Sequence, residues 1–368
     1  MSDALRVGVV AVSPVLGGAE RYLADLYRGL RPRGIEGTLL GHVPEWASTG
    51  LQKIDLRLGP KWSRSTIVRS FALAPMESSK ALRAIRRQHD VQAFDAFHAQ
   101  YKREQVMLSA RLARLAPVVW TEHGRFYRGR GSSALACGYR HAAEAVEVVI
   151  CCSQAVADDV DHICRGRVRC ELIPNGVDVK AFRRLPHPER RRVRAEFGVK
   201  TDKPVLAVVS RLHPAKRIDR AIELAAKAGL ELIVVGDGPD AERLHALGKN
   251  GVIFTGHRDD VARVLGAADA LVVCGAPWGE GIQLTMAEAA AAGCALIGFS
   301  GDALELDVRE SGGVVVGERS DPAQAFESEV LARAGDAAAA WSLRFSQEEW
   351  LWRTADVFRA ATAGAPTT

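Results

Sequence analysis

Two carboxylates, Glu280 and Glu288, lie eight positions apart where an apolar run meets an alanine-rich segment. The run 270–274 predicts a buried parallel strand, and 285–292 predicts a helix. The residues just before and at the start of this helix are Gly281, Ile282, Gln283 and Leu284. Their amides lie where unpaired N–H groups and the helix dipole favour an anion. Two hydroxyl acceptors beside a phosphate-binding backbone match the polarity of a sugar nucleotide.

Two cations follow the first predicted strand of the second half of the chain, in Ser210-Arg-Leu-His-Pro-Ala-Lys216. Arg211 and Lys216 are five positions apart on a strand-to-helix loop. They can converge on a diphosphate, the arginine as a planar fork and the lysine as a point charge. The alternative is a pair of surface cations, but the helix dipole disfavours cations at this place. We therefore predict that they bind an anion.

Three further candidates also follow predicted strands. Gly18, in Gly17-Gly-Ala-Glu20, would let the backbone approach a ligand in front of a helix. His123, in Thr121-Glu-His-Gly124, is placed to hydrogen-bond a substrate hydroxyl or to act as an acid or base, although a lone histidine is usually structural. Gly238, in Gly236-Asp-Gly-Pro239, serves either a turn or the close approach of a ligand.

The sequence lacks the motifs that are typical of several other classes of protein. The chain has no G-x-G-x-x-G dinucleotide motif, no phosphate-binding G-x-x-x-x-G-K-[ST], no H-E-x-x-H and no G-x-S-x-G. Signatures of nucleic-acid binding are also missing, so no nucleic-acid partner is expected. The seven cysteines form no C-x-x-C pair and are expected to be small buried residues in a reducing compartment, with a metal or disulfide at Cys164 and Cys170 as the alternative.

The charge distribution bears on partners. The chain of 368 residues has a net charge of +5, but residues 53–130 hold 16 Lys and Arg against 6 Asp and Glu. An anionic acceptor or an anionic membrane surface would explain this excess, and a solvated face is the alternative. No apolar run approaches the ~20 residues that span a bilayer. A strand candidate begins at residue 5, so we expect no signal peptide and a cytoplasmic location, either free or peripheral at the inner membrane face.

The hydrophobic pattern alternates strand and helix twice along the chain. Strands are predicted at 5–12, 37–43, 94–98, 117–121, 147–152 and 168–173, and then at 204–210, 230–235, 251–255, 269–274 and 294–299. This predicts two Rossmann-like, doubly wound α/β domains with parallel sheets, comprising residues 1–178 and 179–345. The segment 183–204 is rich in charge and proline, as a domain boundary is. The helix 346–368 completes the first domain, and a ligand would bind beyond the strand ends, in an interdomain cleft.

Taken together, these motifs resemble those of retaining glycosyltransferases of family 4, which have the two-domain GT-B fold. The matching segments occur in the family's order along nearly the whole chain. They are Gly17-Gly-Ala-Glu20, Thr121-Glu-His-Gly124, Ser153, Pro174-Asn-Gly-Val-Asp178, Arg211 with Lys216, Gly236-Asp-Gly-Pro239, Ala267-Ala-Asp269, and Glu280 with Glu288. The two glutamates with the upstream arginine and lysine are the most specific part.

The resemblance implies a role for each residue. Arg211 and Lys216 would hold the donor diphosphate and stabilise it as it leaves. Glu288 would accept hydrogen bonds from the ribose, and Glu280 with the amides of 281–284 would hold the donor sugar and phosphate. His123 would face the sugar near the reacting carbon. Further donor contacts would come from Gly18, from Gly238, and from the backbone around His257 and Arg258.

The implied reaction uses no protein nucleophile. A hexose-type sugar would pass from a nucleoside diphosphate, by family frequency a uridine one, to an acceptor hydroxyl on the same face, without a metal or other cofactor. The acceptor would be small and polar, anionic, or lipid-linked. The rivals are an epimerase or phosphorylase on the same fold and a non-catalytic sugar-nucleotide sensor.

Three departures from the family pattern bear on specificity. Gln283 stands where the family usually has glycine, so the identity of the sugar does not carry over. Arg217 replaces a glycine that often follows the lysine, and Cys274-Gly-Ala-Pro277 replaces the usual Pro-Ser.

Overall fold

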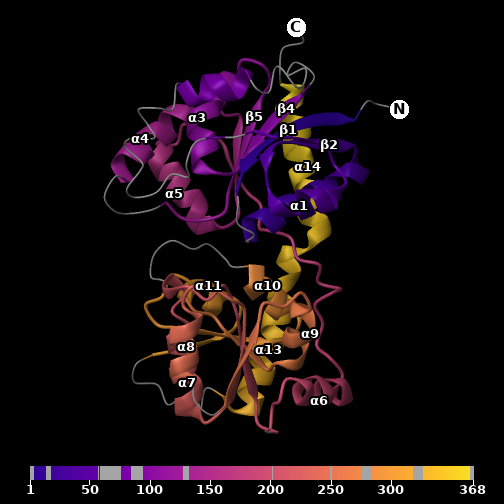
Figure 1. The fold of residues 1–368 in the computed structure, drawn as a ribbon, viewed down its shortest axis with the longest axis vertical. Coiled ribbons are helices and arrows are strands. Elements are labelled where there is room, and N and C mark those ends of the chain that lie inside the picture. The colour runs from indigo at the N-terminus through magenta and orange to yellow at the C-terminus, as the bar shows by residue number, and fades with distance from the viewer. Residues whose placement is uncertain are drawn as a thin grey trace. The chain divides into compact units, whose positions relative to one another are not determined.

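The computed structural model describes residues 4–13, 18–56, 58, 76–83, 94–126, 132–200, 202–248, 251–275, 284–317 and 326–364 (Figure 1). The chain divides into two compact units, each with its own sheet. The first unit comprises Met1–Asn175 and Glu348–Thr368, and the second comprises Gly176–Gln347.

The first unit is built on a seven-stranded sheet with the order β3-β2-β1-β4-β5-β6-β7. All its pairings are parallel, so the carboxyl ends of the strands lie along one edge. The strands are β1 (Leu5–Val12), β2 (Ile35–His42), β3 (Lys53–Ile54), β4 (Ala96–Ala99), β5 (Val118–Glu122), β6 (Val148–Cys151) and β7 (Cys170–Leu172).

Helices cover both faces of this sheet (Figure 1). The helices α3 (Lys102–Leu112), α4 (Ser132–Ala143) and α5 (Gln154–Cys164) pack on one face. Helix α1 (Gly18–Leu30) and the C-terminal helix α14 (Gln347–Ala363) pack on the other. Short 3-10 turns follow α1 at Arg31–Arg33 and β2 at Pro44–Thr49.

Helix α14 joins the first unit through its apolar side. Trp350, Leu351, Ala355 and Phe358, the residues that the sequence placed on this helix, are all at most 5% exposed and share one core with α1. The helices approach closely at Gly29, where an added Cβ would lie 2.5 Å from a methyl group of Leu351. A side chain at this position would therefore displace the Leu351 side chain.

The second unit has a six-stranded parallel sheet with the order β10-β9-β8-β11-β12-β13. This order, 3-2-1-4-5-6 in chain sequence, is that of the doubly wound dinucleotide-binding fold. The strands are β8 (Val205–Val209), β9 (Glu231–Val235), β10 (Val252–Gly256), β11 (Ala270–Val272), β12 (Ala295–Phe299) and β13 (Val314–Val316).

Helices pack on the two faces of that sheet. Helices α7 (Ile218–Ala228) and α8 (Ala241–Leu247) lie on one face, and α9 (Val261–Ala267) and α10 (Leu284–Ala291) lie on the other. The other helices in the described part of this unit are α6 (His187–Glu196), α11 (Glu305–Glu310) and α13 (Ser328–Ser342), with 3-10 turns at Pro214–Lys216 and Leu343–Phe345.

The charged segment 183–204 does not behave as a boundary, because it carries α6 and belongs to the second unit. Two of its arginines pair with one carboxylate of the second unit. Arg194 donates to the Asp269 carboxylate at 2.5 Å and to the Ala267 carbonyl at 2.8 Å, and Arg190 also bonds Asp269. The same carboxylate accepts the N–H of Val205 at 2.7 Å. Asp269 therefore ties α6 to the beginnings of β8 and β11.

The predicted fold class is confirmed: two doubly wound α/β domains with parallel sheets, and a C-terminal helix that returns to the first. Among the described residues, no helix has both the length and the apolar content needed to cross a membrane.

Candidate active site

In the second unit, the loops after β8, β9 and β10 are joined by backbone hydrogen bonds. The N–H groups of Ser210 and Leu212 donate to the carbonyls of Val235 and Asp237 at 3.0 and 2.9 Å. The Gly236 N–H donates to the Gly256 carbonyl at 2.9 Å. Three loops at the carboxyl edge of the sheet thus form one connected surface. It carries three of the predicted ligand-binding positions, Arg211, Gly238 and His257.

The glycines of the second loop are explained by this loop pairing. Gly236 and Gly238 have φ of 131° and 156°, a backbone that favours glycine. A Cβ on Gly236 would lie 2.0 Å from the Ser210 carbonyl oxygen, and one on Gly238 would lie 2.2 Å from that of Leu212. The close approach that these glycines permit is therefore to the neighbouring loop, on which Arg211 stands.

Arg211 and Lys216 lie at the two ends of a short connection between β8 and α7. The 3-10 turn in this connection is capped by His213, whose Nδ1 accepts the N–H of Ala215 at 3.2 Å. Arg211 is exposed, and its side chain forms no ion pair within the described parts of the chain. By contrast, Arg220 in the following helix donates to Asp302 at 2.5 Å. Within the described residues, the guanidinium of Arg211 is thus left without a carboxylate at the edge where a ligand is expected.

Arg217 occupies a backbone conformation that glycine adopts more readily. Its φ and ψ are 50° and 39°, in the left-handed region, where it caps the start of α7. This is the position where the family often has glycine, and the conformation supplies the reason. Its side chain lies 3.8 Å from the Asp219 carboxylate.

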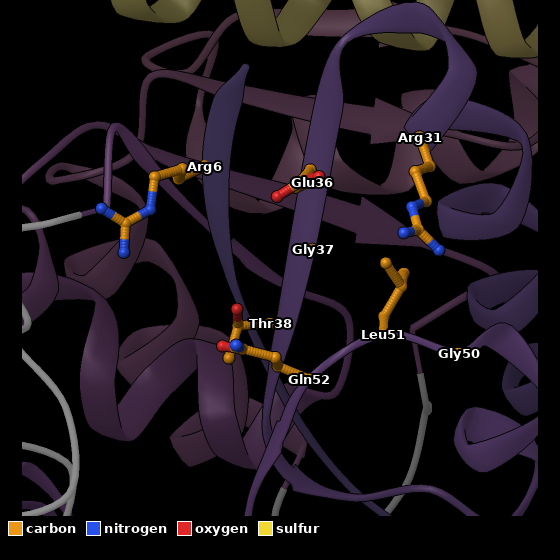
Figure 2. Close-up of a pocket in the computed structure, with 8 residues that line it drawn as sticks. All are labelled: Arg6, Arg31, Glu36, Gly37, Thr38, Gly50, Leu51 and Gln52. Atoms are coloured by element: carbon orange, nitrogen blue, oxygen red, sulfur yellow. The ribbon is translucent and has the colours of Figure 1, made fainter. Parts of the chain in front are cut away.

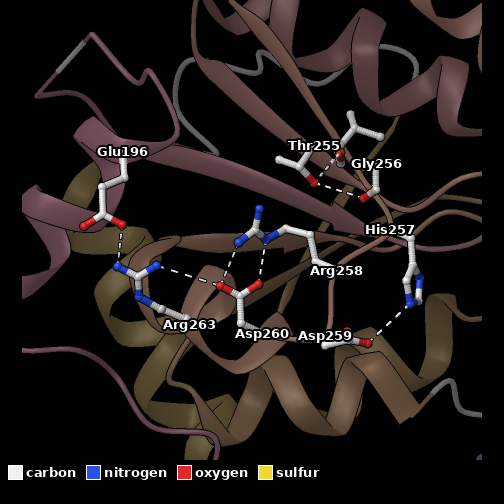
Figure 3. A network of polar contacts seen from close by, with 9 residues as sticks. Glu196, Thr255, Gly256, His257, Arg258, Asp259, Asp260 and Arg263 are labelled. Carbon is white, nitrogen blue, oxygen red and sulfur yellow. Dashed lines mark hydrogen bonds and ion pairs between the residues drawn. The ribbon is translucent and has the colours of Figure 1, made fainter.

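Charged side chains of the loop after β10 pair with one another (Figure 3). The Arg258 guanidinium donates twice to Asp260, at 2.6 and 2.8 Å, and these hydrogen bonds lower the pKa of Asp260. The same guanidinium lies 4.8 Å from the centre of the Phe197 ring. His257 is exposed, with Nε2 3.4 Å from Asp259. Because the Arg258 guanidinium is hydrogen-bonded to Asp260, we expect this loop to contact a ligand mainly through its backbone N–H and carbonyl groups.

The segment that carries the two predicted glutamates is described in part. Glu288 lies on α10 and is half-buried, and Leu284 is the first residue of that helix. Glu280, Gly281, Ile282 and Gln283 lie outside the described residues. The predicted grip of 280–284 on the sugar and phosphate therefore stays a prediction.

In the first unit, His123 follows β5 and is half-buried. Its Nε2 lies 3.1 Å from Gln100 Oε1, and the edge of its ring meets Tyr22 at a centroid distance of 4.4 Å. Burial, together with the positive charge of Lys102, lowers the pKa of His123 to about 4. The imidazole is therefore neutral near pH 7.

The first turn of α1 is tied to the loop after β4. Gly18 begins this helix, and Gly17 lies outside the described residues. The Tyr101 hydroxyl donates to Glu20 at 2.6 Å, and Gln100 Nε2 donates to the Ala19 carbonyl at 3.2 Å. The loop that carries Gln100 thus contacts both the glycine segment and His123.

Buried ion pairs support this edge and were not predicted from the sequence. Glu122 is 3% exposed and accepts hydrogen bonds from Lys102 and from the Tyr139 hydroxyl, the latter at 2.8 Å. Lys102 Nζ also lies 4.2 Å from the centre of the Phe126 ring. The signal was present in Thr121-Glu-His-Gly124, whose glutamate directly precedes the candidate histidine.

The described cations of this edge do not add to a positive field, because each pairs with a carboxylate. Besides Lys102, these are Arg103, which donates to Glu104 at 2.8 Å, and Arg125, which donates twice to Asp159. Half of the basic residues in 53–130 lie outside the described residues. The expected anionic partner is therefore not tested by the structure.

A cavity of about 390 Å³ lies at the opposite edge of the first sheet from His123. Figure 2 shows Arg6 and Arg31 on either side of the strand that carries Glu36. The residues that line the cavity are Arg6, Arg31, Glu36, Gly37, Thr38, Gly50, Leu51 and Gln52. Because ligands of such sheets bind beyond the carboxyl ends of the strands, we do not assign it to the donor.

Comparison with known proteins gives the class. Among solved structures, HepE of Anabaena in complex with UDP matches with a TM-score of 0.78 and 19% identity, covering 97% of this chain and all of that one. The sucrose-phosphate synthase of Thermosynechococcus elongatus matches with a TM-score of 0.76 and 19% identity, covering 98% of this chain and 100% of that one. These likenesses show the fold, and the two doubly wound domains are those of the GT-B fold.

Family models and relatives complete the assignment. Residues 16–181 match the model "Glycosyltransferase Family 4", and residues 203–335 match "Glycosyl transferases group 1". The chain is 26% identical, over 86% of both chains, to a GDP-mannose-dependent monoacylated alpha-(1-6)-phosphatidylinositol monomannoside mannosyltransferase of Corynebacterium glutamicum. It is 31% identical to a GDP-mannose-dependent alpha-mannosyltransferase of Mycobacterium tuberculosis, over 37% of this chain and 35% of that one. The protein is a glycosyltransferase, and it belongs to glycosyltransferase family 4.

Proposed function

We propose that this glycosyltransferase moves a hexose-type sugar from a nucleoside diphosphate to an acceptor hydroxyl, with retention of configuration and without a metal. The observation that carries the proposal is Arg211, an exposed guanidinium without a carboxylate partner among the described residues, on the connected loops after β8, β9 and β10. The next two arginines along the chain, Arg217 and Arg220, each lie beside an aspartate, whereas Arg211 has no carboxylate partner in the described part of the chain, so its charge favours an anionic ligand.

The proposed chemistry needs electrostatic stabilisation rather than a protein nucleophile. The bond from the anomeric carbon to the phosphate oxygen loosens first, and the acceptor oxygen then bonds to that carbon from the same face. The departing phosphate takes the acceptor's proton. Arg211 and Lys216 would stabilise the charge that develops on the diphosphate, which is the role that a metal plays in other transferases.

The remaining residues would position the donor. The Glu288 carboxylate would accept hydrogen bonds from the ribose, and Glu280 with residues 281–284 would hold the sugar and phosphate. The loop of His257 and Arg258 would meet the nucleobase through its backbone. His123 would contact a hydroxyl of the donor sugar.

We propose GDP-mannose as the first donor to test, because a relative that spans 86% of both chains is named as dependent on it. A UDP-sugar, expected from the sequence, is the alternative. The names of three relatives contain phosphatidylinositol monomannoside, L-malate and D-inositol 3-phosphate, all of which are anionic. This supports an anionic acceptor, whether free in the cytoplasm or lipid-linked at the inner face of the membrane.

A thermal-shift panel would test the donor. The panel compares GDP, UDP and ADP, and the sugar conjugates of each, by the melting temperature of the protein. The nucleotide of the true donor should raise this temperature most, because a specific ligand stabilises the folded protein by mass action. The preferred donor, incubated with inositol phosphate, malate or phosphatidylinositol liposomes, should give a product whose mass exceeds that of the acceptor by one hexose residue. Release of nucleoside diphosphate only when an acceptor is present would separate a transferase from an epimerase, a phosphorylase or a sensor. Equal release without any acceptor would contradict the proposal.

A further inference from the structure

Gln100 connects His123 to the first turn of α1. Its side chain is 5% exposed, and both ends of its amide are engaged. The Nε2 group donates to the Ala19 carbonyl at 3.2 Å, and Oε1 lies 3.1 Å from His123 Nε2. A backbone carbonyl can only accept a hydrogen bond, so the Ala19 carbonyl sets which end of the amide faces which partner.

This orientation determines where His123 carries its proton. Oε1 of Gln100 is an acceptor, so the facing Nε2 of His123 must be the donor. A neutral imidazole has a single N–H, which leaves Nδ1 with a free lone pair. No hydrogen bond to this Nδ1 occurs among the described residues.

The surroundings favour the neutral ring. Among the described residues, the titratable groups that face His123 are Lys102 from α3, Tyr22 from α1, His98 from β4 and the adjacent Glu122 of β5. Lys102 opposes a second positive charge, and burial opposes any charge on the ring. The carboxylate of Glu122 is occupied by Lys102 and Tyr139, so it does not hold an imidazolium.

We propose that Gln100 is a positioning residue that holds His123 as the Nε2–H tautomer, so that Nδ1 accepts a hydrogen bond from a hydroxyl of the donor sugar. This inference rests on the proposed function, in which His123 contacts that sugar. It excludes one of the roles that the sequence left open, that of an acid at Nδ1, because a ring in this state accepts a hydrogen bond and has no proton to give at Nδ1. The Tyr101–Glu20 hydrogen bond fixes the same loop to α1 and keeps the amide in place.

The tautomer can be observed without any substrate. Long-range proton–nitrogen spectra of protein labelled with ¹⁵N-histidine report which ring nitrogen carries the proton, and the His123→Asn variant assigns the signal. We expect a protonated Nε2 and an unprotonated Nδ1 for His123 at pH 7. In Gln100→Leu the ring loses its acceptor, and the two tautomers should both be populated. A protonated Nδ1 in the unmodified protein would overturn the inference, whatever the enzyme's donor is.

Kinetics test the consequence for catalysis. Gln100→Leu should lower kcat about ten- to a hundredfold with little change in donor KM, because a misplaced group costs rate on this scale. Gln100→Glu places a carboxylate beside His123 that stabilises the imidazolium, so the acid limb of the kcat/KM profile should move to higher pH. The matched control is Gln52→Glu, which adds the same charge at an exposed position on the opposite edge of the same sheet. An unshifted profile in Gln100→Glu would refute the positioning role.

The proposed roles of His123 and of Gln100 can be refuted separately. If the spectra show the expected tautomer but His123→Ala keeps the kcat of the unmodified enzyme, the proposed contact of His123 with the sugar is wrong. If His123→Ala loses activity but the tautomer is the other one, Gln100 is not its positioning residue. Should Gln100→Leu fail to fold, the Gln100→Glu variant, which matches glutamine in size, still decides the question.

Discussion

Acid should destabilise the first unit through His98, a histidine buried in the middle of its sheet. The side chain is 0% exposed and bridges two hydroxyl groups, with Nδ1 3.0 Å from the Tyr27 hydroxyl and Nε2 2.8 Å from the Thr121 hydroxyl. Burial lowers the pKa of His98 from 6.5 to about 3. The unfolded chain binds a proton below pH 6.5, whereas the folded protein does not until near pH 3. The stability that this histidine contributes is therefore present above pH 6.5 and is lost as the pH falls towards 3.

The magnitude follows from linkage. One proton taken up only by the unfolded state costs about 1.4 kcal/mol per pH unit, so the free energy of unfolding should fall by about 2 kcal/mol between pH 7.5 and 5 on account of His98. The perturbation is His98→Gln, because a glutamine amide can still bridge two hydroxyl groups but does not titrate. The variant should lose about 2 kcal/mol less than the unmodified protein over the same pH interval.

The assay has to separate the two units. Urea unfolding at pH 7.5 and pH 5, followed by hydrogen exchange of peptides from β4 and from β8, reports each unit by itself. His162→Gln is the matched control, because it removes an exposed histidine from the same unit. An equal pH dependence of β4 unfolding in His98→Gln and in the unmodified protein would refute the reasoning. The reasoning would also be refuted if His162→Gln reduced the pH dependence of β4 unfolding as much as His98→Gln does.

Four further predictions follow from the second unit and from the proposed chemistry. Lys216→Ala should lower kcat/KM by about ten- to a hundredfold, the loss of one charged contact to the diphosphate, whereas the exposed Lys227→Ala should not; unchanged kinetics would exclude the role of Lys216. Activity should survive EDTA, and loss with rescue by magnesium would show that a metal takes part. Arg217→Gly should raise the free energy of unfolding by about 0.5–1 kcal/mol by relieving its left-handed backbone, and Arg217→Ala should not, as urea unfolding can measure. Asp269→Ala should cost about 3–5 kcal/mol by leaving two largely buried arginines unpaired, against about 0.5 kcal/mol or less for the exposed Asp259→Ala; similar values for the two would show that the ion pairs contribute little.

The fold could be predicted well because parallel strands, buried on both faces, appear as apolar, β-branched runs. Every strand run named from the sequence overlaps an observed strand. Strand β3 was missed because it has only two residues, Lys53 and Ile54, and no pattern can show in so short a run. Strand β13 was missed although Val314–Val316 follows two glycines, a signal that the pattern offered.

Charge density misled the interpretation of residues 183–204. A run of arginines looks like a solvated linker when the sequence is read locally, but Arg190 and Arg194 meet Asp269, 75 or more positions away. Gln100 was missed for a similar reason. Glutamine has no characteristic pattern, and its role depends on Ala19 and His123, which lie far from it in sequence and within hydrogen-bond distance in the folded chain.

The structure also separates two kinds of residue within the family's motifs. Gly236, Gly238 and Asp269 are engaged by the protein itself, the glycines against the carbonyls of the β8 loop and the aspartate against α6. Their substitution should therefore disturb the loops before it disturbs a ligand. Arg211 has no such protein partner among the described residues. The loops are held in place by the motif residues that contact the protein itself. Arg211 stands on one of these loops, and we therefore expect it to contribute binding energy for a diphosphate. The contrast predicts that Arg211→Ala would leave the free energy of unfolding within about 0.5 kcal/mol of the unmodified value while weakening diphosphate binding, and that Asp269→Ala would do the reverse.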